Sequence, residues 1–257
     1  MKNNSIKKKE SALIVLQEEI AENVYSMWIE TDISKNCIPG QFISVYPDDP
    51  SKLLPRPISI CETDNGRLRI VYRIAGEGTG EFSALKKGDH IDILGPLGNG
   101  FPVLEGKAIL IGGGIGIPPM LGLARSRNKN DTIIVSGYRN SDMFLEKELS
   151  NNGTLMIATE DGSVGIKGNV MDVLHEKNLR ADVIYACGPL PMLKAVKEYS
   201  EKTGITAYVS MEERMACGIG ACLACVCSST EVDDHSKVKN KRICKDGPVF
   251  NVKEVNL

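Results

Sequence analysis

Five of the eight cysteines fall between residues 217 and 244. Three follow the spacing C-x4-C-x2-C, at Cys217, Cys222 and Cys225, and Cys244 comes later in the chain. This is the plant-type spacing of thiolates that hold a [2Fe–2S] cluster. Glycines and alanines separate these cysteines, as a loop wrapped around inorganic sulfide requires. The pattern predicts that these four cysteines ligate a [2Fe–2S] cluster.

The main alternative for these cysteines is a structural zinc ion, because four thiolates also suit Zn²⁺. Zinc sites more often show two short cysteine pairs, whereas this chain has a triple and a single, so the spacing favours iron and sulfide. A zinc-binding regulatory module is the corresponding alternative function. Cys227 is left over and is interpreted as a packed thiol.

A second candidate site is the glycine-rich turn that follows the apolar run at 107–111. Glycines there allow a sharp turn and the close approach of a pyrophosphate, and Pro118 or Pro119 suits the first helical position. Ile117 stands where the G-x-G-x-x-G fingerprint has its third glycine. The turn predicts a nicotinamide dinucleotide site with the ligands Gly112, Gly113, Gly114 and Gly116.

Other segments of the same region place polar residues directly after apolar runs. Ligands of open α/β sheets bind at the carboxyl ends of the strands. We therefore expect the same dinucleotide to contact Glu160, Asp161, Cys187 and Gly188. Arg139 also follows a predicted strand, and it is interpreted either as a ligand of a 2′-phosphate or as an exposed loop cation.

The first hundred residues hold a third candidate site, for a flavin diphosphate. The first motif is RPIS at 56–59, where the planar guanidinium of Arg56 can bind phosphate. The second is GEGTG at 76–80, where a glycine turn before a predicted helix offers N–H groups to an anion. Taken singly, each motif also fits an edge strand or a flexible loop. Together they predict that a flavin diphosphate binds in this region.

The elements that must position these residues change character twice along the chain. Residues 1–102 contain short β-branched runs separated by turns, which predict an antiparallel six-stranded β-barrel. Residues 103–212 alternate buried strands with helices, which predicts a parallel α/β sheet. Residues 213–257 are short and cysteine-rich, which predicts a small iron–sulfur domain that depends on its metal for order.

Composition excludes several classes of function. The chain has 257 residues and a net charge of −2, which gives no support to nucleic acid as a partner. It has no run of eighteen apolar residues and no signal-peptide pattern, so no membrane association is expected. We expect a cytoplasmic protein, and in that reducing compartment the cysteines do not indicate disulfides.

The motifs in the first two regions resemble the ferredoxin-reductase flavoprotein family. The resemblance rests on RPIS at 56–59, the G-x-G-T turn at 76–79, GPLGNGF at 95–101 and the C-G-P motif at 187–189. It implies that Arg56 and Ser59 contact the pyrophosphate and isoalloxazine of FAD, and that Gly78 and Thr79 cap the pyrophosphate. By matching positions, the resemblance implies the FAD candidates Arg56, Pro57, Ile58, Ser59, Gly78 and Thr79, and more weakly Tyr72 and Arg73. It also places Cys187 beside the nicotinamide ring, so the resemblance implies Ser59 and Cys187 as catalytic residues.

The C-terminal region narrows the resemblance. MEERMACGIGACLACVC at 211–227 and RICKDGPVF at 242–250 resemble the electron-transfer subunits of type B dihydroorotate dehydrogenases. The order RPIS, GGGIGIPPM, TEDGSVGIKG, ACGPLPM and the cysteine signature extends this resemblance over nearly the whole chain. It implies an oxidoreductase component of pyrimidine biosynthesis that uses NAD(H), FAD and a [2Fe–2S] cluster, in a heterotetramer with an FMN-containing subunit that oxidises dihydroorotate to orotate. The alternative is the small subunit of a ferredoxin:NADP or sulfide-type reductase.

Overall fold

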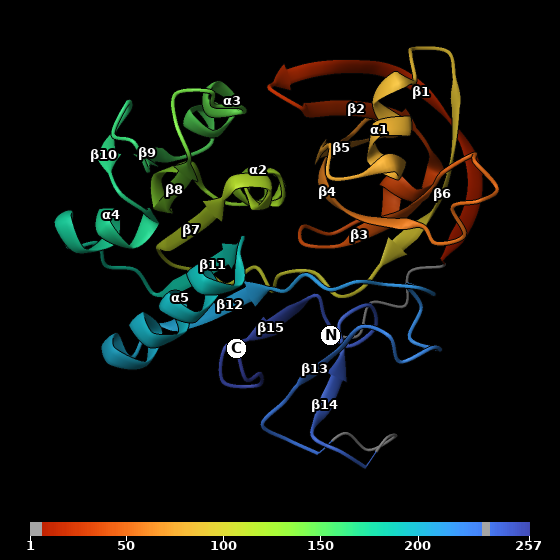
Figure 1. Cartoon of the computed structure of the whole chain (residues 1–257). Coiled ribbons are helices and arrows are strands. Elements are labelled where there is room, and N and C mark those ends of the chain that lie inside the picture. The colour runs from red at the N-terminus through yellow and green to blue at the C-terminus, as the bar shows by residue number, and fades with distance from the viewer. Residues whose placement is uncertain (1–6, 233–236) are drawn as a thin grey trace.

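The computed structural model describes residues 7–232 and 237–257, and it has three parts (Figure 1). A barrel contains the N-terminal strands, a sheet flanked by helices lies beside it, and the cysteine-rich C-terminal segment lies below both. Residues 1–6 and 233–236, which belong to the first and third expected domains, are outside the described ranges. Within those ranges, no helix is long and apolar enough to cross a membrane.

The barrel is closed by six antiparallel strands in the order β1-β2-β5-β4-β3-β6, which confirms the expected architecture. Side chains alternate between the interior and the outer face, as the two-residue period of a strand requires. The strands are β1 (Lys8–Ala21), β2 (Val24–Glu30), β3 (Phe42–Tyr46), β4 (Arg56–Asp64), β5 (Arg67–Arg73) and β6 (His90–Leu97). Helix α1 (Glu77–Ala84) adds Phe82 to the barrel core, with its ring edge-on to Tyr72.

The second part is a seven-stranded sheet in the order β10-β9-β8-β7-β11-β12-β15. All neighbouring strands run parallel except β12 and β15. The strands are β7 (Ala108–Gly113), β8 (Thr132–Tyr138), β9 (Thr154–Thr159), β10 (Ile166–Lys167), β11 (Val183–Cys187), β12 (Thr206–Ser210) and β15 (Val249–Asn251). Short 3₁₀ turns, η1 (Asp32–Asn36), η2 (Gly114–Gly116) and η3 (Lys129–Asp131), lie between the regular elements.

Four helices cover the two faces of this sheet, which explains why its strands are continuous apolar runs. Helices α2 (Pro118–Arg125) and α3 (Glu146–Asn151) share one core with the side of β7 that carries Leu110. Helices α4 (Val170–Glu176) and α5 (Leu190–Thr203) share the other core with Ile109 and Ile111. The carboxyl ends of the parallel strands remain open, and they are where a ligand can bind.

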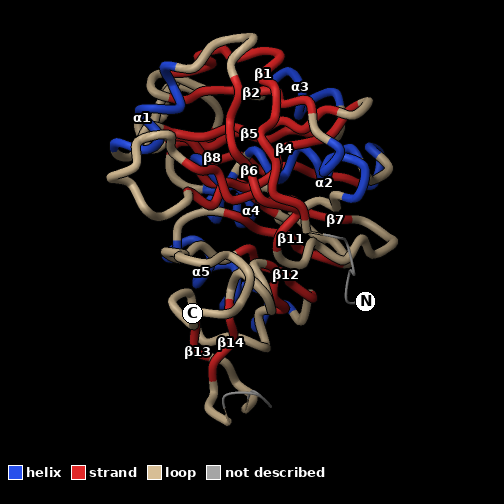
Figure 2. The backbone as a smooth tube through the Cα atoms, turned by 90° about the vertical axis from the view of Figure 1, so that its right-hand side faces the viewer, coloured by secondary structure: helices blue, strands red, loops and turns tan. Residues whose placement is uncertain are grey.

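The C-terminal segment does not form a body of its own throughout. It first makes a two-stranded hairpin, β13 (Val226–Ser228) and β14 (Asn240–Arg242), at the lower end of the molecule (Figure 2). It then returns to the sheet as β15, where Phe250 pairs with Val209 of β12. The sequence predicted that the sheet ends near residue 212. It did not reveal β15, because a three-residue strand carries too little periodicity to be recognised. The return of β15 ties the cysteine-rich segment to the sheet.

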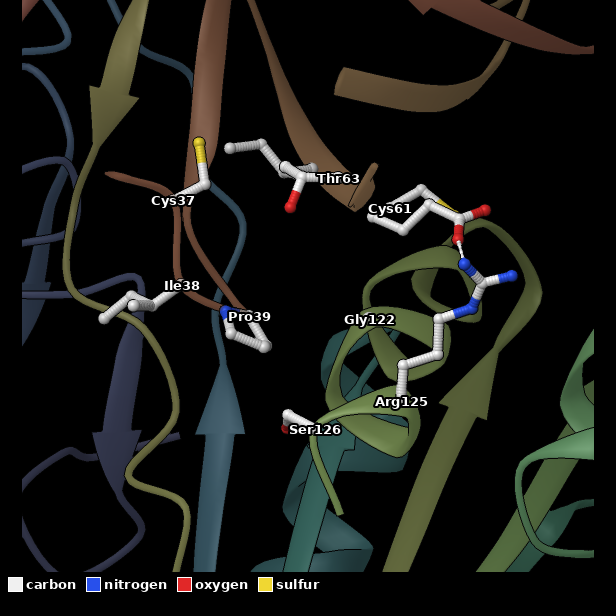
Figure 3. A pocket seen from close by; sticks show the side chains of 10 residues that line it. Cys37, Ile38, Pro39, Cys61, Thr63, Gly122, Arg125 and Ser126 are labelled. Carbon is white, nitrogen blue, oxygen red and sulfur yellow. Dashed lines mark ion pairs between the residues drawn. The ribbon is translucent and has the colours of Figure 1, made fainter. Parts of the chain in front are cut away.

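The barrel and the sheet meet where α2 packs against β4 (Figure 3). A Cβ on Gly122 of α2 would lie 2.4 Å from the carbonyl oxygen of Cys61, so only glycine allows this approach. Beside it, Glu62 of β4 forms ion pairs with Arg69 of β5 and with Arg125 of α2. A small cavity of about 190 Å³ lies next to this contact. The junction therefore joins the two domains through close backbone packing and a buried carboxylate.

Candidate functional site

A cavity of about 670 Å³ opens at the carboxyl ends of the parallel strands. Strand β7 lies between β8 and β11, so the chain reverses its strand order here, which is the position where open α/β sheets bind ligands. The barrel closes the other side of the cavity with Glu22, Asn23, Arg73 and Ile74. A ligand bound in this cavity would therefore touch both domains.

The glycine-rich turn forms one wall of this cavity. Gly113, Gly114 and Gly116 line it, and α2 begins directly afterwards with Pro118 at its first position. A Cβ on Gly116 would lie 2.3 Å from the carbonyl oxygen of Cys187, so a side chain cannot be accommodated there. This close approach brings the backbone N–H groups of the turn to the cavity, where they can bind an anion. Gly112, also predicted as a ligand, is buried behind the turn.

Cys187 ends strand β11 beneath the cavity, and it is only 1% exposed. Its neighbour Gly188 lines the cavity, as predicted. Burial raises the pKa of the Cys187 thiol well above its usual range, and the nearby Glu212 carboxylate raises it further. The thiol is therefore protonated at neutral pH, and it can contribute shape and a weak S–H donor but not a thiolate.

The two acidic residues predicted after β9 separate in the structure. Glu160 lines the cavity. The Asp161 carboxylate instead accepts hydrogen bonds from the backbone N–H and the hydroxyl of Ser163, at 2.9 and 2.7 Å, and these bonds lower its pKa. The structure thus brings Glu160 to the predicted site, whereas the Asp161 carboxylate holds its own turn.

Glu212 is a cavity residue that sequence reasoning missed. It lies two residues after the end of β12 and lines the cavity together with Gly188 and Met192. Burial against the cavity wall raises the pKa of its carboxyl group. The signal was available, because Glu212 follows the carboxyl end of the last parallel strand, where ligand-binding residues are expected.

A separate anion-binding geometry lies on the barrel at the start of α1. A Cβ on Gly78 would lie 2.7 Å from Nε of Arg56, so the guanidinium rests directly against the first turn of the helix. The Thr79 hydroxyl accepts hydrogen bonds from the N–H groups of Ala75 and Gly76, at 2.8 and 3.2 Å, and so shapes this turn. Guanidinium, bare glycine backbone and helix N-terminus together fit the pyrophosphate of a flavin dinucleotide.

The other predicted flavin residues are divided between the two sides of the barrel wall. Ile58 points into the barrel core, so Pro57 and Ser59 face outward on the same strand, β4. Tyr72 does not join them, because its ring is buried in the barrel and its hydroxyl donates to Oε1 of Gln17 at 3.1 Å. Arg73 lines the dinucleotide cavity rather than the Arg56 site.

The four predicted cluster cysteines lie near one another. The Cys217 thiol interacts with Cys222, and the Cys244 thiol interacts with both Cys225 and Cys217. In residues 7–232 and 237–257, no three His, Cys, Asp or Glu side chains converge on a point that could hold a single metal ion. Neighbouring cysteines with the spacing C-x4-C-x2-C and a later fourth cysteine fit a [2Fe–2S] cluster, in which each iron takes two thiolates.

Backbone donors surround these sulfur atoms. Sγ of Cys217 accepts hydrogen bonds from the N–H groups of Ala221 and Cys222, at 3.3 and 3.4 Å, and Sγ of Cys225 accepts one from Cys244 at 3.4 Å. Burial alone would raise the pKa of Cys217, but backbone donors led by Ile219 lower it to about 6. The loop therefore favours the thiolate form at Cys217, whereas burial raises the pKa of Cys244 to about 12. Cys227 packs in the apolar core, as predicted.

Solved structures share this arrangement. The NADH-dependent reduced ferredoxin–NADP oxidoreductase is similar over 96% of this chain and 90% of its own, with a TM-score of 0.86 and 31% sequence identity. The ferredoxin reductase of carbazole 1,9a-dioxygenase shares the fold over 79% of this chain and 68% of its own, with a TM-score of 0.67 and 21% identity. Fold and site together define a ferredoxin-reductase-like oxidoreductase with an added iron–sulfur domain.

Sequence comparisons identify the family. Residues 212–256 match the iron–sulfur cluster binding domain of dihydroorotate dehydrogenase B, and residues 110–198 match the oxidoreductase NAD-binding domain. The electron transfer subunits of dihydroorotate dehydrogenase B (NAD(+)) from Fusobacterium nucleatum and Listeria monocytogenes are each 45% identical to this chain. The alignments cover 93% and 95% of this chain and 95% and 97% of those proteins. The chain belongs to this family of electron transfer subunits. It is an oxidoreductase component, and its cofactors are NAD(H), FAD and a [2Fe–2S] cluster.

Proposed function

We propose that this chain carries electrons between NAD(H) and an FMN-containing catalytic subunit that oxidises dihydroorotate to orotate. The observation that carries the proposal is the order of the three sites. The dinucleotide cavity lies between sheet and barrel, the outward face of β4 carries Ser59, and the cysteine loop packs against the neighbouring strand β3 at Gly218. One connected molecule thus holds all three sites at the contacts between its domains.

The cofactors would supply the electron chemistry: a flavin can exchange two electrons at once with NAD(H) and single electrons with an iron–sulfur cluster, so oxidation of dihydroorotate can be coupled to reduction of NAD⁺. The chain's own residues hold and orient them. The Arg56 guanidinium and the first turn of α1 hold the flavin pyrophosphate, while Gly113–Gly116 receive the nicotinamide dinucleotide. Cys187 and Glu212 shape the inner end of the cavity, and Ser59 offers its hydroxyl to the flavin ring. The proposed division into domains at 1–102, 103–212 and 213–257 follows these three tasks, except that β15 from the last range completes the sheet of the second domain.

The charge balance of the cavity favours NADH over NADPH. Among the described residues that line it, four are acidic, Glu22, Asp142, Glu160 and Glu212, and two are arginines, Arg73 and Arg139. A 2′-phosphate would add negative charge to a site that already carries a carboxylate excess. We propose that Glu160 instead accepts hydrogen bonds from ribose hydroxyls, in the role that an acidic residue has in other dinucleotide sites.

The cysteine loop offers the surface for the catalytic subunit. Cys222 is exposed, and on the same loop Ile219 and Leu223 are 44% and 46% exposed. Apolar side chains grouped on a surface mark protein contacts. A partner seated there would approach the cluster closely. The proposal includes a heterotetramer of two plus two chains in the cytoplasm.

Replacing Cys222 by serine tests the proposed ligation in the intact complex. We expect Cys222→Ser to abolish the cluster absorption and its electron paramagnetic resonance signal, because one iron loses a thiolate. FAD should remain bound, since its site lies on the barrel. Electron transfer from dihydroorotate to NAD⁺ should fall at least a hundredfold, while reduction of FAD by NADH persists. The matched control Cys227→Ala should keep the cluster, because Cys227 lies in the core. Retention of a full cluster signal in Cys222→Ser would contradict the assignment.

Isolation of the chain from its native cell with its partner tests the proposed assembly. We expect an FMN protein to co-purify with the chain. The molar mass of the complex, measured by light scattering, should equal that of two copies of each chain. The likeness to the NADH-dependent reduced ferredoxin–NADP oxidoreductase supports a second candidate, in which the same local chemistry serves a different partner. A co-purifying subunit that reduces NADP⁺ and has no dihydroorotate activity would favour that candidate and overturn the first.

A further inference from the structure

Ser44 lies in the middle of β3, where a hydroxyl has no evident structural task. Its neighbours Ile43 and Val45 fill the barrel core, so Ser44 points to the outer face of the barrel. The residue is only 1% exposed, yet its Oγ has no hydrogen-bond partner within the described part of the chain. Burying an unpaired hydroxyl is unfavourable. The position therefore points to a group that accepts its hydrogen bond in the functional protein.

The hydroxyl faces the loop that carries the first cluster cysteine. A Cβ on Gly218 would lie 2.9 Å from Oγ of Ser44 and 3.2 Å from Cδ1 of Leu97. Gly218 follows Cys217 directly, and its φ of +66° suits glycine. The loop thus lies close against the barrel at this point, and the Ser44 hydroxyl is directed at the backbone beside Cys217.

The hydrogen-bond donors already described around Sγ of Cys217 belong to the cysteine loop. The backbone N–H groups that act on Sγ of Cys217 come from its own loop, at Ile219, Ala221 and Cys222. Ser44 approaches the same loop from the barrel. Hydrogen bonds to cluster sulfurs are one of the features that set the reduction potential of an iron–sulfur cluster.

We propose that the Ser44 hydroxyl donates a hydrogen bond to the sulfur atoms at the Cys217 side of the [2Fe–2S] cluster and raises its reduction potential. The inference rests on the ligation by Cys217 proposed above. The reduced cluster carries more negative charge on its sulfurs, so a donated hydrogen bond stabilises the reduced form more than the oxidised form. Ser44 is thus a residue of the barrel that acts directly on the cluster in the neighbouring domain.

The strand register adds a reason for a residue at this place. Ser44 pairs with Pro57 of β4, which belongs to the RPIS segment proposed to hold FAD. A single side chain between these segments can adjust the cluster potential relative to that of the flavin. The competing possibility, that the hydroxyl serves FAD itself, predicts a shift in the flavin potential instead.

The test is a redox titration of the complete complex, with the cluster followed by electron paramagnetic resonance and FAD by absorption. We expect Ser44→Ala to shift the cluster equilibrium about tenfold toward the oxidised form, which is about 59 mV for a one-electron couple. The flavin potential should not change. Ser44→Thr, which restores a hydroxyl, should recover the potential. The control Ser34→Ala removes another buried barrel hydroxyl, which donates to the carbonyl of Thr31, and should leave both potentials unchanged.

The other possible results of the titration bear either on the hydrogen bond from Ser44 or on the ligation of the cluster. An unchanged cluster potential in Ser44→Ala, or a shift confined to the flavin, overturns the proposal. If Ser44→Ala fails to assemble, Ser44→Cys carries the test, because a thiol is a weaker donor of similar size and should give a smaller shift in the same direction. A wild-type complex without any cluster signal would contradict the proposed ligation rather than the hydrogen bond, so the two failures are distinguishable.

Discussion

Arg56 shows how one side chain links a strand to a helix. It begins β4, and its guanidinium lies against the backbone at Gly78 in the first turn of α1. Pro57 removes the helical option for Arg56, so the side chain leaves an extended backbone. The planar guanidinium and the free N–H groups of the turn then offer donors to the same anion from two directions. Neither element would bind a pyrophosphate tightly alone.

Replacing Arg56 by alanine should weaken FAD binding. A hydrogen bond to a charged group contributes about 1.5–3 kcal/mol, so the dissociation constant of FAD should rise about tenfold to a hundredfold. Fluorescence titration of the apoprotein with FAD measures this change. The matched control Arg67→Ala removes an exposed arginine at the start of β5 and should bind FAD normally. Equal affinities of the two variants would show that Arg56 does not hold the pyrophosphate.

At the scale of elements, two turns at the carboxyl ends of β7 and β11 form a wall of the proposed dinucleotide site. The first turn is η2 with its glycines, and the second contains Cys187 and Gly188. They touch at Gly116, where a Cβ would meet the carbonyl oxygen of Cys187 at 2.3 Å. Both turns lie at the same edge of the sheet because β7 and β11 are parallel neighbours. Their contact presents the backbone of both turns to the cavity.

Gly116→Ala should therefore separate the two turns. Overpacking costs about 1–3 kcal/mol, and at about 2–4 °C per kcal/mol the melting temperature should fall by several degrees. The KM for NADH should rise at least tenfold while FAD content stays normal. Calorimetry and steady-state reduction of a dye by NADH measure these effects. Gly80→Ala is the control, because nothing lies within 4 Å of its Cβ position and α1 should tolerate alanine. A normal KM in Gly116→Ala would contradict the proposed site.

At the scale of the whole molecule, function depends on how the barrel and the sheet are held together. The Glu62 side chain is 2% exposed and pairs with Arg69 of the barrel at 2.8 Å and with Arg125 of α2. Arg69 also reaches Glu148 of α3 at 3.1 Å. A buried carboxylate is tolerated only when it is paired, so this network favours one relative position of the two domains.

Glu62→Gln should lower the free energy of unfolding by about 3 kcal/mol, because two arginines at the junction lose their carboxylate. Arg125→Met should cost less, since the Arg125 side chain is 42% exposed and partly screened by water. Reduction of FAD by NADH should also slow in Glu62→Gln, because the dinucleotide cavity has walls from both domains. Denaturant unfolding and stopped-flow absorption measure the two effects.

A surface pair provides the control for this network. Glu176→Gln removes a carboxylate that pairs with Lys177 at 2.9 Å, with both side chains about half exposed, and such pairs contribute little. We expect no measurable change in unfolding or flavin reduction. If Glu62→Gln also left the free energy of unfolding and the rate of flavin reduction unchanged, the junction would depend on backbone packing at Gly122 and not on charge.

The sequence by itself determined the local structure and the chemical groups of this protein. Alternating runs predicted the six barrel strands, and the cysteine spacing predicted four ligands of one cluster, because both patterns are local in the sequence. The glycines at 112–116 predicted the turn for the same reason. Glu160 was found because it follows a strand, and the same rule would have found Glu212.

Only the tertiary structure decided which distant segments meet. Ser44 lies against a loop that comes more than 170 residues later in the chain. Strand β15 joins the sheet, although the sequence pattern predicted that the sheet ends near residue 212. Tyr72 has the residue type of a flavin ligand, but it points into the barrel because β5 alternates its side chains between the two faces. Local patterns specify strands, turns and donors, whereas the contacts between distant segments follow from packing of the complete chain. That packing places the three cofactor sites next to one another.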